Sequence, residues 1–593
     1  MREYNQNKIK WNHLLLGPKT ALALILVIII VTVIYLRTML PGMGYSGDTA
    51  KFQFIGKVLG VPHPPGYPLY VLLNRLFVTL PIGSIAFRAN LMSLFFGLLT
   101  VVFLYFIILR LGVDSYLAAG TSLTFAFSYT FWTQSLIAEV YTLNSFFLAV
   151  IIFLLLKWQQ TGRRVYFQWS VLLFGLSLAH HLTMVFLAPA LLFLLIKLVP
   201  RELFNPKTWR LALISLTLAI IPYSFLVVRT YQRAPYLESP VRNLVDFYNV
   251  ITAKYFQVDL FAFGWRELIT KRIPWFFDQI EDEWTWPLLL IMIIGWGWMN
   301  RSHRIFSFFL IIFMVAQSIF ITNYHIHDIF VFFIPVYFCL AIFLGAGWQS
   351  LISKFKTLSL IPRFPALKLL SLAIFSLCIA SPLYLGYKNF PRADFKKLTF
   401  YDEQFNVLFT SIDPKKPVII LTDNYLETQF VYNKRFLDYP QHFILHVAYE
   451  PDREVLPQIK TRLDYEILTN RRLQCYLFPD CERLRPEAML NQFWSQRMLP
   501  ERREILSAVY FNSTYVRLKL FKEGIRTVKL IGREKRKGGF TFIIVPFFRP
   551  NFKKIGAALS IYHIYLSFLS KTFSSTCSMK PVMFQLRKLV GNL

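Results

Sequence analysis

Charged residues are scarce in this chain, and acidic residues are scarcer than basic ones. Asp, Glu, Lys and Arg make up only 16% of the 593 residues, whereas about a quarter is typical of soluble domains. Instead, 55% of the residues are hydrophobic and 17% are aromatic. The apolar residues come in blocks of about 20, the length at which a helix crosses a bilayer core. The composition therefore excludes an ordinary soluble domain and predicts an α-helical polytopic membrane protein.

Several catalytic signatures are also missing. The chain has no P-loop, GxGxxG, HExxH or GxSxG pattern, so nothing argues for nucleotide-driven transport or a classical hydrolase. Its five cysteines form no metal-binding pattern. Cys475 and Cys481 could pair if their region lies outside the cytoplasm. We expect no resident metal or cofactor, although a role for a divalent ion stays open.

The excess of basic residues has an explanation other than nucleic acid. A formal net charge of +31 is of the kind that nucleic-acid-binding proteins carry. Much of the surplus, however, falls in short loops between apolar blocks, where the orientation of a membrane protein accounts for it. We therefore expect the lipid bilayer as a partner and no nucleic acid.

The apolar blocks predict about eleven membrane spans. We expect them near residues 21–40, 86–109, 115–131, 136–156, 166–181, 183–199, 208–228, 285–300, 305–322, 329–348 and 366–387. Alternate loops carry the Lys and Arg residues, among them Arg110, Lys157, Arg201, Arg301 and Lys354. By the positive-inside rule these loops and the N-terminus are cytoplasmic, and the other loops and the C-terminal region lie outside.

Three regions follow from this pattern. Residues 1–390 form the predicted transmembrane domain. Residues 391–549 are richer in charge and contain β-type runs such as residues 418–422, which predicts a small extracytoplasmic α/β domain. Residues 550–593 are a basic tail, either interfacial or disordered.

The stretch from Ser46 to Tyr70 combines an acid and a histidine with a cluster of prolines. Asp48 opens a short amphipathic segment, and the chain then breaks at a cluster of prolines around His63. Prolines at this density forbid a regular helix and fix a rigid turn. Asp48 could simply cap the helix, and His63 could be a loop residue bonded to backbone. The sharper interpretation makes Asp48 a general base and gives His63 a role with phosphate.

The other polar residues of interest also fall on the outer side: Arg88, Glu139, His180, His181, Arg229, His325, His327 and Asp328. An acid at the start of an apolar span usually faces a partner or an aqueous cavity, so Glu139 is the strongest functional candidate in this set. The two arginines could be snorkelling cations or a phosphate clamp. The last three residues have a spacing that could hold a metal, but catalytic zinc usually needs three well-placed ligands and an open position.

Five segments resemble, in order, a widespread family of polytopic membrane proteins. They are GDTAKFQFIGKVLGVPHPPGYPLY, AFRANLMS, FWTQSLIAEVYTLN, FGLSLAHHLTM and NYHIHDIFVFFIPVY. The family was formerly catalogued as a domain of unknown function. Its animal member is an endoplasmic-reticulum protein O-mannosyltransferase that acts on receptor ectodomains. The resemblance covers roughly residues 15–390.

The resemblance implies a GT-C-like membrane glycosyltransferase with a polyprenyl-phosphate sugar donor and a catalytic acid in the first outer loop. Asp48 matches that acid by position and context. Glu139, His63, Arg88 and His181 match recurrent family positions without an assigned role. The expected reaction transfers a sugar, mannose-like by resemblance, to a protein or glycan acceptor on the outer face.

Our hypothesis takes Asp48 and Glu139 as the catalytic residues. The donor phosphate or sugar would be bound by His63, Arg88, His180, His181, Arg229, His325, His327 and Asp328. The alternative is a transporter or flippase of a lipid-linked or amphiphilic substrate. The chain shows neither the paired repeats nor the mid-span charges that transporters often have. We expect the protein in a bacterial inner membrane.

Overall fold

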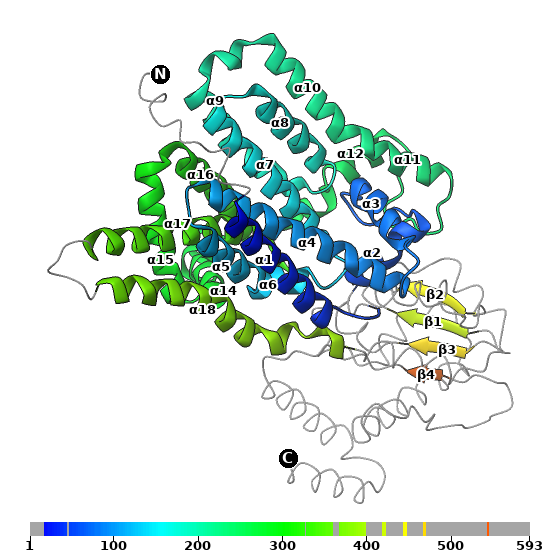
Figure 1. Ribbon diagram of the computed structural model, residues 1–593. Coiled ribbons are helices and arrows are strands. Elements are labelled where there is room, and N and C mark those ends of the chain that lie inside the picture. The colour runs from blue at the N-terminus through cyan, green and yellow to red at the C-terminus, as the bar shows by residue number, and fades with distance from the viewer. Residues whose placement is uncertain are drawn as a thin grey trace, which may run out of the picture.

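The computed structural model describes residues 17–43, 47–326, 328–359, 367–398, 418–422, 443–447, 466–469 and 542–544. Up to residue 398 the regular structure is helical, and four short strands lie beyond it (Figure 1). The α-helices are α1 (Pro18–Thr38), α2 (Gly47–Val58), α3 (Pro68–Val78), α4 (Ile85–Arg110), α5 (Ser115–Ala126), α6 (Tyr129–Gln134), α7 (Tyr141–Thr161), α8 (Arg164–Leu178), α9 (Ala188–Leu198), α10 (Pro206–Ile220), α11 (Ser224–Tyr231), α12 (Leu244–Ile251), α13 (Trp265–Glu267), α14 (Ile273–Trp284), α15 (Trp286–Ser302), α16 (Arg304–Asn323), α17 (Ile334–Ser359) and α18 (Leu367–Ala393).

Short segments of other helical types join them: η3 (Leu182–Leu187), η4 (Pro200–Phe204), η5 (Ile221–Tyr223), η6 (Lys254–Asp259), η7 (Leu268–Arg272), η8 (Ile329–Phe333) and η9 (Phe395–Lys397). η7 is a π-helix and the others are 3₁₀-helices.

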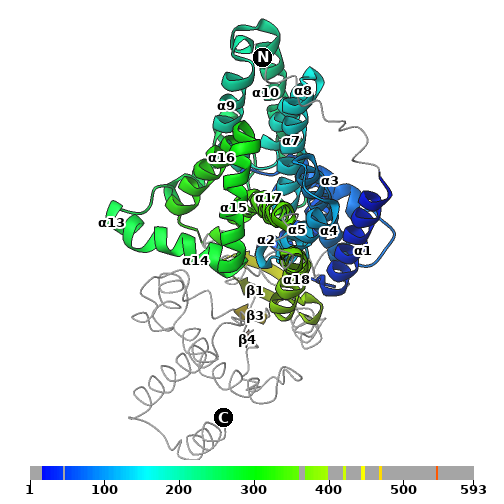
Figure 2. The ribbon, with the colours of Figure 1, turned by 60° about the vertical axis from the view of Figure 1, so that its left-hand side comes forward.

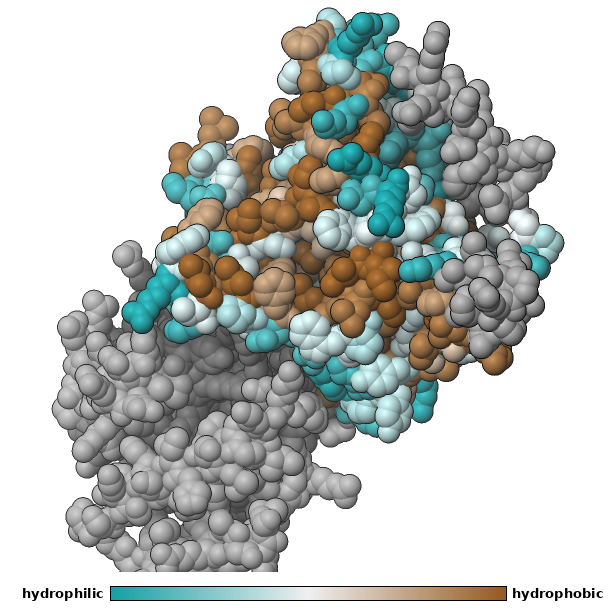
Figure 3. Space-filling model, turned by 90° about the vertical axis from the view of Figure 1, so that its left-hand side faces the viewer, coloured by the Kyte–Doolittle hydropathy of each residue, from teal (hydrophilic) through white to brown (hydrophobic). Residues whose placement is uncertain are grey.

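Seven helices in the described part of the chain are long and apolar enough to cross a membrane. They are Pro18–Thr38, Ile85–Arg110, Tyr141–Thr161, Pro206–Tyr231, Arg304–Asn323, Ile329–Phe355 and Leu369–Lys397. Each corresponds to one of the predicted spans. Figure 3 shows hydrophobic side chains across the middle of one face of these helices, with hydrophilic ones gathered above and below. The chain is therefore a multi-pass integral membrane protein.

The other four predicted spans correspond to shorter or interrupted helices. The block near 115–131 divides into α5 and α6, the blocks near 166–181 and 285–300 are α8 and α15, and the block near 183–199 is η3 followed by α9. The break before α6 has a visible cause. The backbone N–H and the hydroxyl of Thr130 both donate to the carboxylate of Glu283, each at 2.8 Å. An acid far along the chain thus caps a new helix where hydropathy predicts a continuous one.

Helices α4, α5, α7 and α17 form the centre of the body (Figures 1 and 2). In the span that contains α17, 83% of the apolar window is buried, against 28% for α1 at the edge. Helix α15 packs closely on α17 because glycines face each other there. A Cβ at Gly295 would lie 1.8 Å from the carbonyl oxygen of Phe343, and one at Gly347 would lie 2.1 Å from that of Ile291. Small residues allow such close approach between membrane helices.

The strands form one parallel sheet in the order β2-β1-β3-β4. They are β1 (Val418–Thr422), β2 (Phe443–Val447), β3 (Glu466–Thr469) and β4 (Phe542–Ile544). The β-type run predicted at residues 418–422 is thus a strand. The segments between these strands, the pair Cys475 and Cys481, and the tail 550–593 lie outside the described residues, so the α/β domain as a whole stays a prediction.

Candidate functional site

Helix α2 carries the acid that the sequence singles out. Asp48 lies in the first turn, where the helix dipole favours a negative charge. Phe52 and Ile55 are buried and hold one face of α2 against the core. The Asp48 side chain, in contrast, is 49% exposed. A substrate can therefore reach this carboxylate.

Lys51 lies one turn after Asp48, at the centre of a polar cluster. Its ammonium group donates to Asp48 Oδ1 at 3.0 Å and to Glu238 Oε1 at 3.1 Å, and it lies 2.8 Å from Nδ1 of His63. The Lys51 side chain is only 5% exposed. Because His63 belongs to the proline-rich loop and Glu238 to the loop after α11, three separate segments meet here. We call these four residues the Lys51 cluster.

The charges of the Lys51 cluster oppose the effect of burial on its acid and its base. Burial raises the pKa of Asp48, but the charges of Lys51 and His63 and the hydrogen bond from Lys51 outweigh it and lower that pKa to about 2. Burial lowers the pKa of Lys51, but the charges of Asp48 and Glu238 raise it above its ordinary value. Asp48 is therefore ionised, and Lys51 protonated, across neutral pH.

Glu139, which precedes α7, is buried beside α2. Its Oε1 accepts a hydrogen bond from the Thr49 hydroxyl at 3.0 Å, and its backbone is tied to the Ser93 hydroxyl at 3.2 Å. Burial, and then the charge of Asp48, raise the pKa of Glu139 well above its ordinary value, while the bond from Thr49 works in the opposite direction. The two predicted catalytic acids thus meet at α2 in environments that favour different protonation states, a pattern that acid–base sites use.

The HPPGYP loop turns the chain back onto the Lys51 cluster. Gly66 has a φ of +84°, and a Cβ there would lie 2.5 Å from a Leu226 methyl carbon. Tyr67 follows at φ +41° and ψ +48°, in the left-handed region that few other non-glycine residues adopt. Its ring lies 5.3 Å from the His63 ring and 6.0 Å from the His181 ring. The strained tyrosine therefore links two of the predicted histidines.

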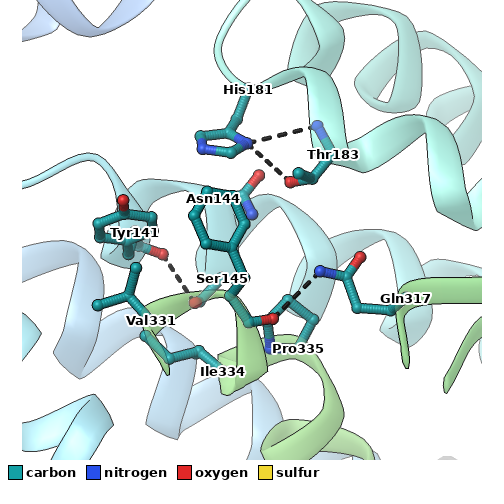
Figure 4. Close-up of a pocket in the computed structure, with 10 residues that line it drawn as sticks. Tyr141, Asn144, Ser145, His181, Thr183, Gln317, Val331, Ile334 and Pro335 are labelled. Carbon is teal, nitrogen blue, oxygen red and sulfur yellow. Dashed lines mark hydrogen bonds between the residues drawn. The ribbon is translucent and has the colours of Figure 1, made fainter. Parts of the chain in front are cut away.

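A pocket lies beside His181, between α7, η3, α16 and the start of α17 (Figure 4). Nδ1 of His181 accepts hydrogen bonds from the hydroxyl of Thr183 at 2.7 Å and from its backbone N–H at 3.4 Å, so a neutral ring carries its proton on Nε2. The lining residues are Tyr141, Asn144, Ser145, His181, Thr183, Gln317, Val331, Phe332, Ile334 and Pro335. They include no Lys or Arg. A lining of rings, hydroxyls and amides suits an uncharged hydroxyl-bearing group better than a phosphate.

The short link between α16 and η8 carries three predicted site residues, and the structure places them differently relative to the pocket. Asp328 accepts a hydrogen bond from the Tyr141 hydroxyl at 3.4 Å, which places it next to the pocket. His325 is exposed, and its backbone N–H donates to the carbonyl of Asp259 at 2.9 Å. His327 lies outside the described residues. In the described part of the chain, no three His, Cys, Asp or Glu side chains are grouped so that they could hold a metal.

The two arginines that are predicted to bind phosphate donate to backbone carbonyls in the structure. Arg229 donates to the carbonyls of Val58 and Leu59, at 3.0 and 2.7 Å, and so caps the end of α2. Arg88 donates to the carbonyl of Ser84 at 3.2 Å, within the turn that starts α4. These guanidinium groups stabilise turns around the site and are not joined to the Lys51 cluster by these bonds.

His180 is buried next to the segment that carries Glu139. Its side chain is fully buried, and its Nε2 lies 2.9 Å from the carbonyl oxygen of Val140. The bond ties the end of α8 to the segment that carries Glu139. His180 therefore supports the site from behind, whereas its neighbour His181 lines the pocket.

Sequence reasoning missed two members of the Lys51 cluster. The contact of Lys51 with Asp48 could have been predicted, because the two residues are three apart on a predicted helix and such side chains are neighbours. Glu238 had none, because 187 positions separate it from Lys51. Tyr67 and Tyr141 were overlooked because their type suits a core as well as a site.

Residues 48–202 match the family model described as the protein O-mannosyl-transferase TMEM260 N-terminal domain. This segment is therefore similar to that domain. The resemblance that the sequence motifs indicate is thus confirmed for the segment that holds Asp48, Lys51, His63, Glu139 and His181. Glu238 lies beyond it.

Two curated relatives match part of the chain. The chain is 34% identical over 204 residues to the mouse protein O-mannosyl-transferase TMEM260, which covers 32% of this chain and 28% of the mouse protein. It is 29% identical over 143 residues to the Dictyostelium discoideum protein O-mannosyl-transferase tmem260, which covers 24% of this chain and 17% of that protein. The matches therefore span less than a third of the relatives' length.

Two solved structures are similar to the model at low sequence identity. ArnT from Cupriavidus metallidurans, bound to undecaprenyl phosphate, has 13% identity and a TM-score of 0.46, covering 72% of this chain and 86% of that one. The Saccharomyces cerevisiae protein O-mannosyltransferase Pmt1–Pmt2 complex, bound to the sugar donor, has 17% identity and a TM-score of 0.28, covering 37% and 34%.

Proposed function

We propose that this chain is an integral membrane glycosyltransferase that transfers a sugar from a polyprenyl-phosphate donor to a protein or glycan acceptor. The observation that carries the proposal is the ionised, half-exposed carboxylate of Asp48, held by Lys51 within the segment that matches the TMEM260 N-terminal domain. The relatives are named protein O-mannosyl-transferases, so a mannose-like sugar is the first candidate.

Asp48 serves as the base of the reaction. The acceptor hydroxyl oxygen bonds to the anomeric carbon of the sugar, the bond from that carbon to the phosphate oxygen breaks, and the phosphate leaves on the lipid. A carboxylate with a pKa of about 2 is a weak base. It orients the hydroxyl by accepting its hydrogen bond, and it takes the proton only as the oxygen becomes positively charged on bonding to the sugar. Such proton transfer contributes roughly 10²–10⁴-fold in rate.

Different groups around Asp48 contact the sugar and the phosphate of the donor. The pocket beside His181, whose lining has no Lys or Arg, receives a hydroxyl group of the sugar, which can donate to the unpartnered oxygens of Asn144 and Gln317. His63 faces the phosphate. Glu139, protonated and buried, supports α2 through Thr49. Hydrogen-bond donors aimed at the departing phosphate act where its charge develops.

The side of the membrane follows from the donor. Nucleotide sugars do not cross a bilayer, so a transferase outside the cytoplasm takes its sugar from a lipid carrier. The basic loops favour a cytoplasmic N-terminus and place α2 outside. If α5–α6, α8, η3–α9 and α15 also cross, the count reaches the predicted eleven in a GT-C-like arrangement, and the C-terminal region lies outside a bacterial inner membrane.

The test uses membranes from cells that lack the chain. These are complemented with wild type, Asp48→Asn or Asp278→Asn at matched levels and supplied with radiolabelled polyprenyl-phosphate mannose. Asp278 is an exposed acid on α14 and serves as the matched control. We expect wild type and Asp278→Asn to transfer label to a protein or glycan fraction. The rate of transfer by Asp48→Asn should be at least 100-fold lower.

Full transfer by Asp48→Asn would contradict the mechanism. If no variant transfers label from any of a panel of lipid-linked sugars, but wild type moves the donor across the membrane of sealed vesicles, the transporter alternative is correct instead.

A further inference from the structure

The ammonium group of Lys51 uses its whole hydrogen-bonding capacity inside the Lys51 cluster. A lysine ammonium has three N–H donors and no acceptor. Nζ lies 3.0 Å from Asp48 Oδ1, 2.8 Å from His63 Nδ1, and 3.1 and 2.8 Å from the two carboxylate oxygens of Glu238. Each of the three partners thus takes one donor, and no donor is left for a substrate.

This arrangement dictates the state of the His63 ring. Because Lys51 cannot accept a hydrogen bond, Nδ1 of His63 must supply a lone pair to it. A neutral imidazole with a lone pair on Nδ1 carries its proton on Nε2. We propose that Lys51 is a positioning residue that fixes His63 as a neutral imidazole with Nε2–H directed at the substrate, and that Glu238 holds Lys51 in place. The inference rests on the proposed function, because it assigns His63 a substrate to face.

The closeness of Asp48 explains why His63 needs such control. Asp48 Oδ1 lies 3.6 Å from Nδ1 of His63, and a carboxylate at that distance favours the imidazolium form. A proton taken up at Nδ1 would pair with Asp48 and mask the base. Lys51 supplies the positive charge between the two groups, so Asp48 stays available and His63 stays neutral.

The charges that face His63 favour this state on balance. Burial and the charge of Lys51 lower the pKa of His63, whereas the charges of Asp48 and Glu238 raise it, and the sum lowers it. The Tyr67 ring lies 5.3 Å from the His63 ring, and His181 lies beyond Tyr67. The apolar rings of Phe52 and Phe256 lie 6.0 and 5.9 Å from the His63 ring, and the side chain of His63 keeps 15% of its surface exposed.

Glu238 is held in register with the loop that bears His63. The N–H of Val61 donates to the carbonyl of Tyr236 at 2.9 Å, and the N–H of Glu238 donates to the carbonyl of Val61 at 2.8 Å. The Tyr236 hydroxyl donates to the Glu238 carboxylate at 3.3 Å. The contact between Glu238 and Lys51 is therefore fixed by backbone pairing as well as by charge.

The test measures the protonation of His63 directly, without a donor. Purified full-length wild type, Lys51→Met, Lys51→Arg and Glu238→Gln in detergent are incubated in D₂O, where the C2–H of a histidine ring exchanges through the imidazolium form and the exchange rate therefore falls only below the pKa of that ring. Mass spectrometry follows deuterium in the His63 peptide at pH 5.5 and 7.5. The exposed His325 confirms in each digest that exchange has taken place.

We expect equal His63 rates at both pH values in wild type and in Lys51→Arg, which keeps the charge. In Lys51→Met the rate should fall about tenfold at pH 5.5, since an imidazole of ordinary pKa near 6.5 is then about nine-tenths protonated. Glu238→Gln removes a charge that raises the pKa of His63, so its two rates should stay equal. Lys51→Gln, which keeps a donor but no charge, should show a smaller fall and replaces Lys51→Met if that variant does not fold.

A tenfold fall in wild type would overturn the proposal, as would an unchanged profile in a folded Lys51→Met. The transfer assay gives a second measurement: Lys51→Met should lose activity below pH 7 where wild type does not. If wild type transfers no sugar, the deuterium-exchange result still decides the role of Lys51, so the failure of the proposed function and the failure of this inference can be told apart.

Discussion

Asp48 and Glu139 are carboxyl groups that the fold places at one helix in different environments. Asp48 is half-exposed and faces the Lys51 ammonium, whereas Glu139 is buried and faces the Thr49 hydroxyl. Burial next to a second negative charge favours the neutral acid, and a nearby cation favours the carboxylate. The same type of side chain is thus favoured as a carboxylate in one position and as a neutral acid in the other.

The state of Glu139 makes stability depend on pH. Its pKa is raised in the folded chain, so folding favours its protonated form. The corresponding stability is fully present below the unfolded pKa of about 4.3 and is lost as pH rises toward the folded pKa. Glu139→Gln removes this dependence and keeps an acceptor for Thr49. We expect the melting temperature of Glu139→Gln, relative to wild type, to rise between pH 5 and pH 8.

Thermal unfolding in detergent at several pH values measures this difference. Glu281→Gln, which removes an acid from α14 outside the site, separates the effect of position 139 from that of losing any carboxyl group. Parallel wild-type and Glu139→Gln curves across this range would mean that Glu139 is ionised in the folded chain.

At the scale of elements, the contact between α15 and α17 depends on glycine. A side chain at Gly295 would meet the backbone of α17, whereas Gly297, two residues on, has no atom within 4 Å of the same position. Overpacking typically costs about 1–3 kcal/mol, and replacing an open helical glycine with alanine gains about 0.5–1 kcal/mol. The two glycines of one helix therefore differ in what they do.

Alanine substitution should move stability in opposite directions at these two positions. We expect Gly295→Ala to lower the melting temperature in detergent and Gly297→Ala to leave it unchanged or raise it slightly. Because both changes add the same methyl group to the same helix, a loss of equal size at both sites would show that propensity, and not the contact with α17, governs the effect.

The elements also show what sequence can and cannot reveal. Hydropathy predicts the seven spanning helices because the length and apolar character of each run by themselves indicate a lipid environment. It missed the break before α6 because the cause is Glu283, a partner from another part of the chain. The proline loop and Asp48 were recognisable locally, whereas the contact of Lys51 with Glu238 requires the tertiary fold. The bond from Arg229 to a carbonyl of α2 likewise depends on the tertiary fold.

For the whole molecule, the order of the helices sets which loops share a side of the membrane. The loop that carries Glu238 and α12–α14 should lie on the same side as α2, and the turn between α15 and α16 on the opposite side. In a background without native cysteines, a cysteine at Asp278 should react with an impermeant maleimide in intact spheroplasts. A cysteine at Arg301 should react only after lysis. The reverse pattern would invert the proposed orientation.

The segment from Arg229 to Glu238 is fastened at both ends to the same short region. Arg229 holds the end of α2, and Glu238 reaches back to Lys51 in the middle of that helix. Val61 pairs with the backbone between them. The number of residues between Arg229 and Glu238 is therefore fixed by the structure. One inserted or deleted residue would turn the Glu238 side chain to the opposite face of the paired backbone, away from Lys51. Related chains that keep this site should tolerate substitution in the segment but not a change in its length.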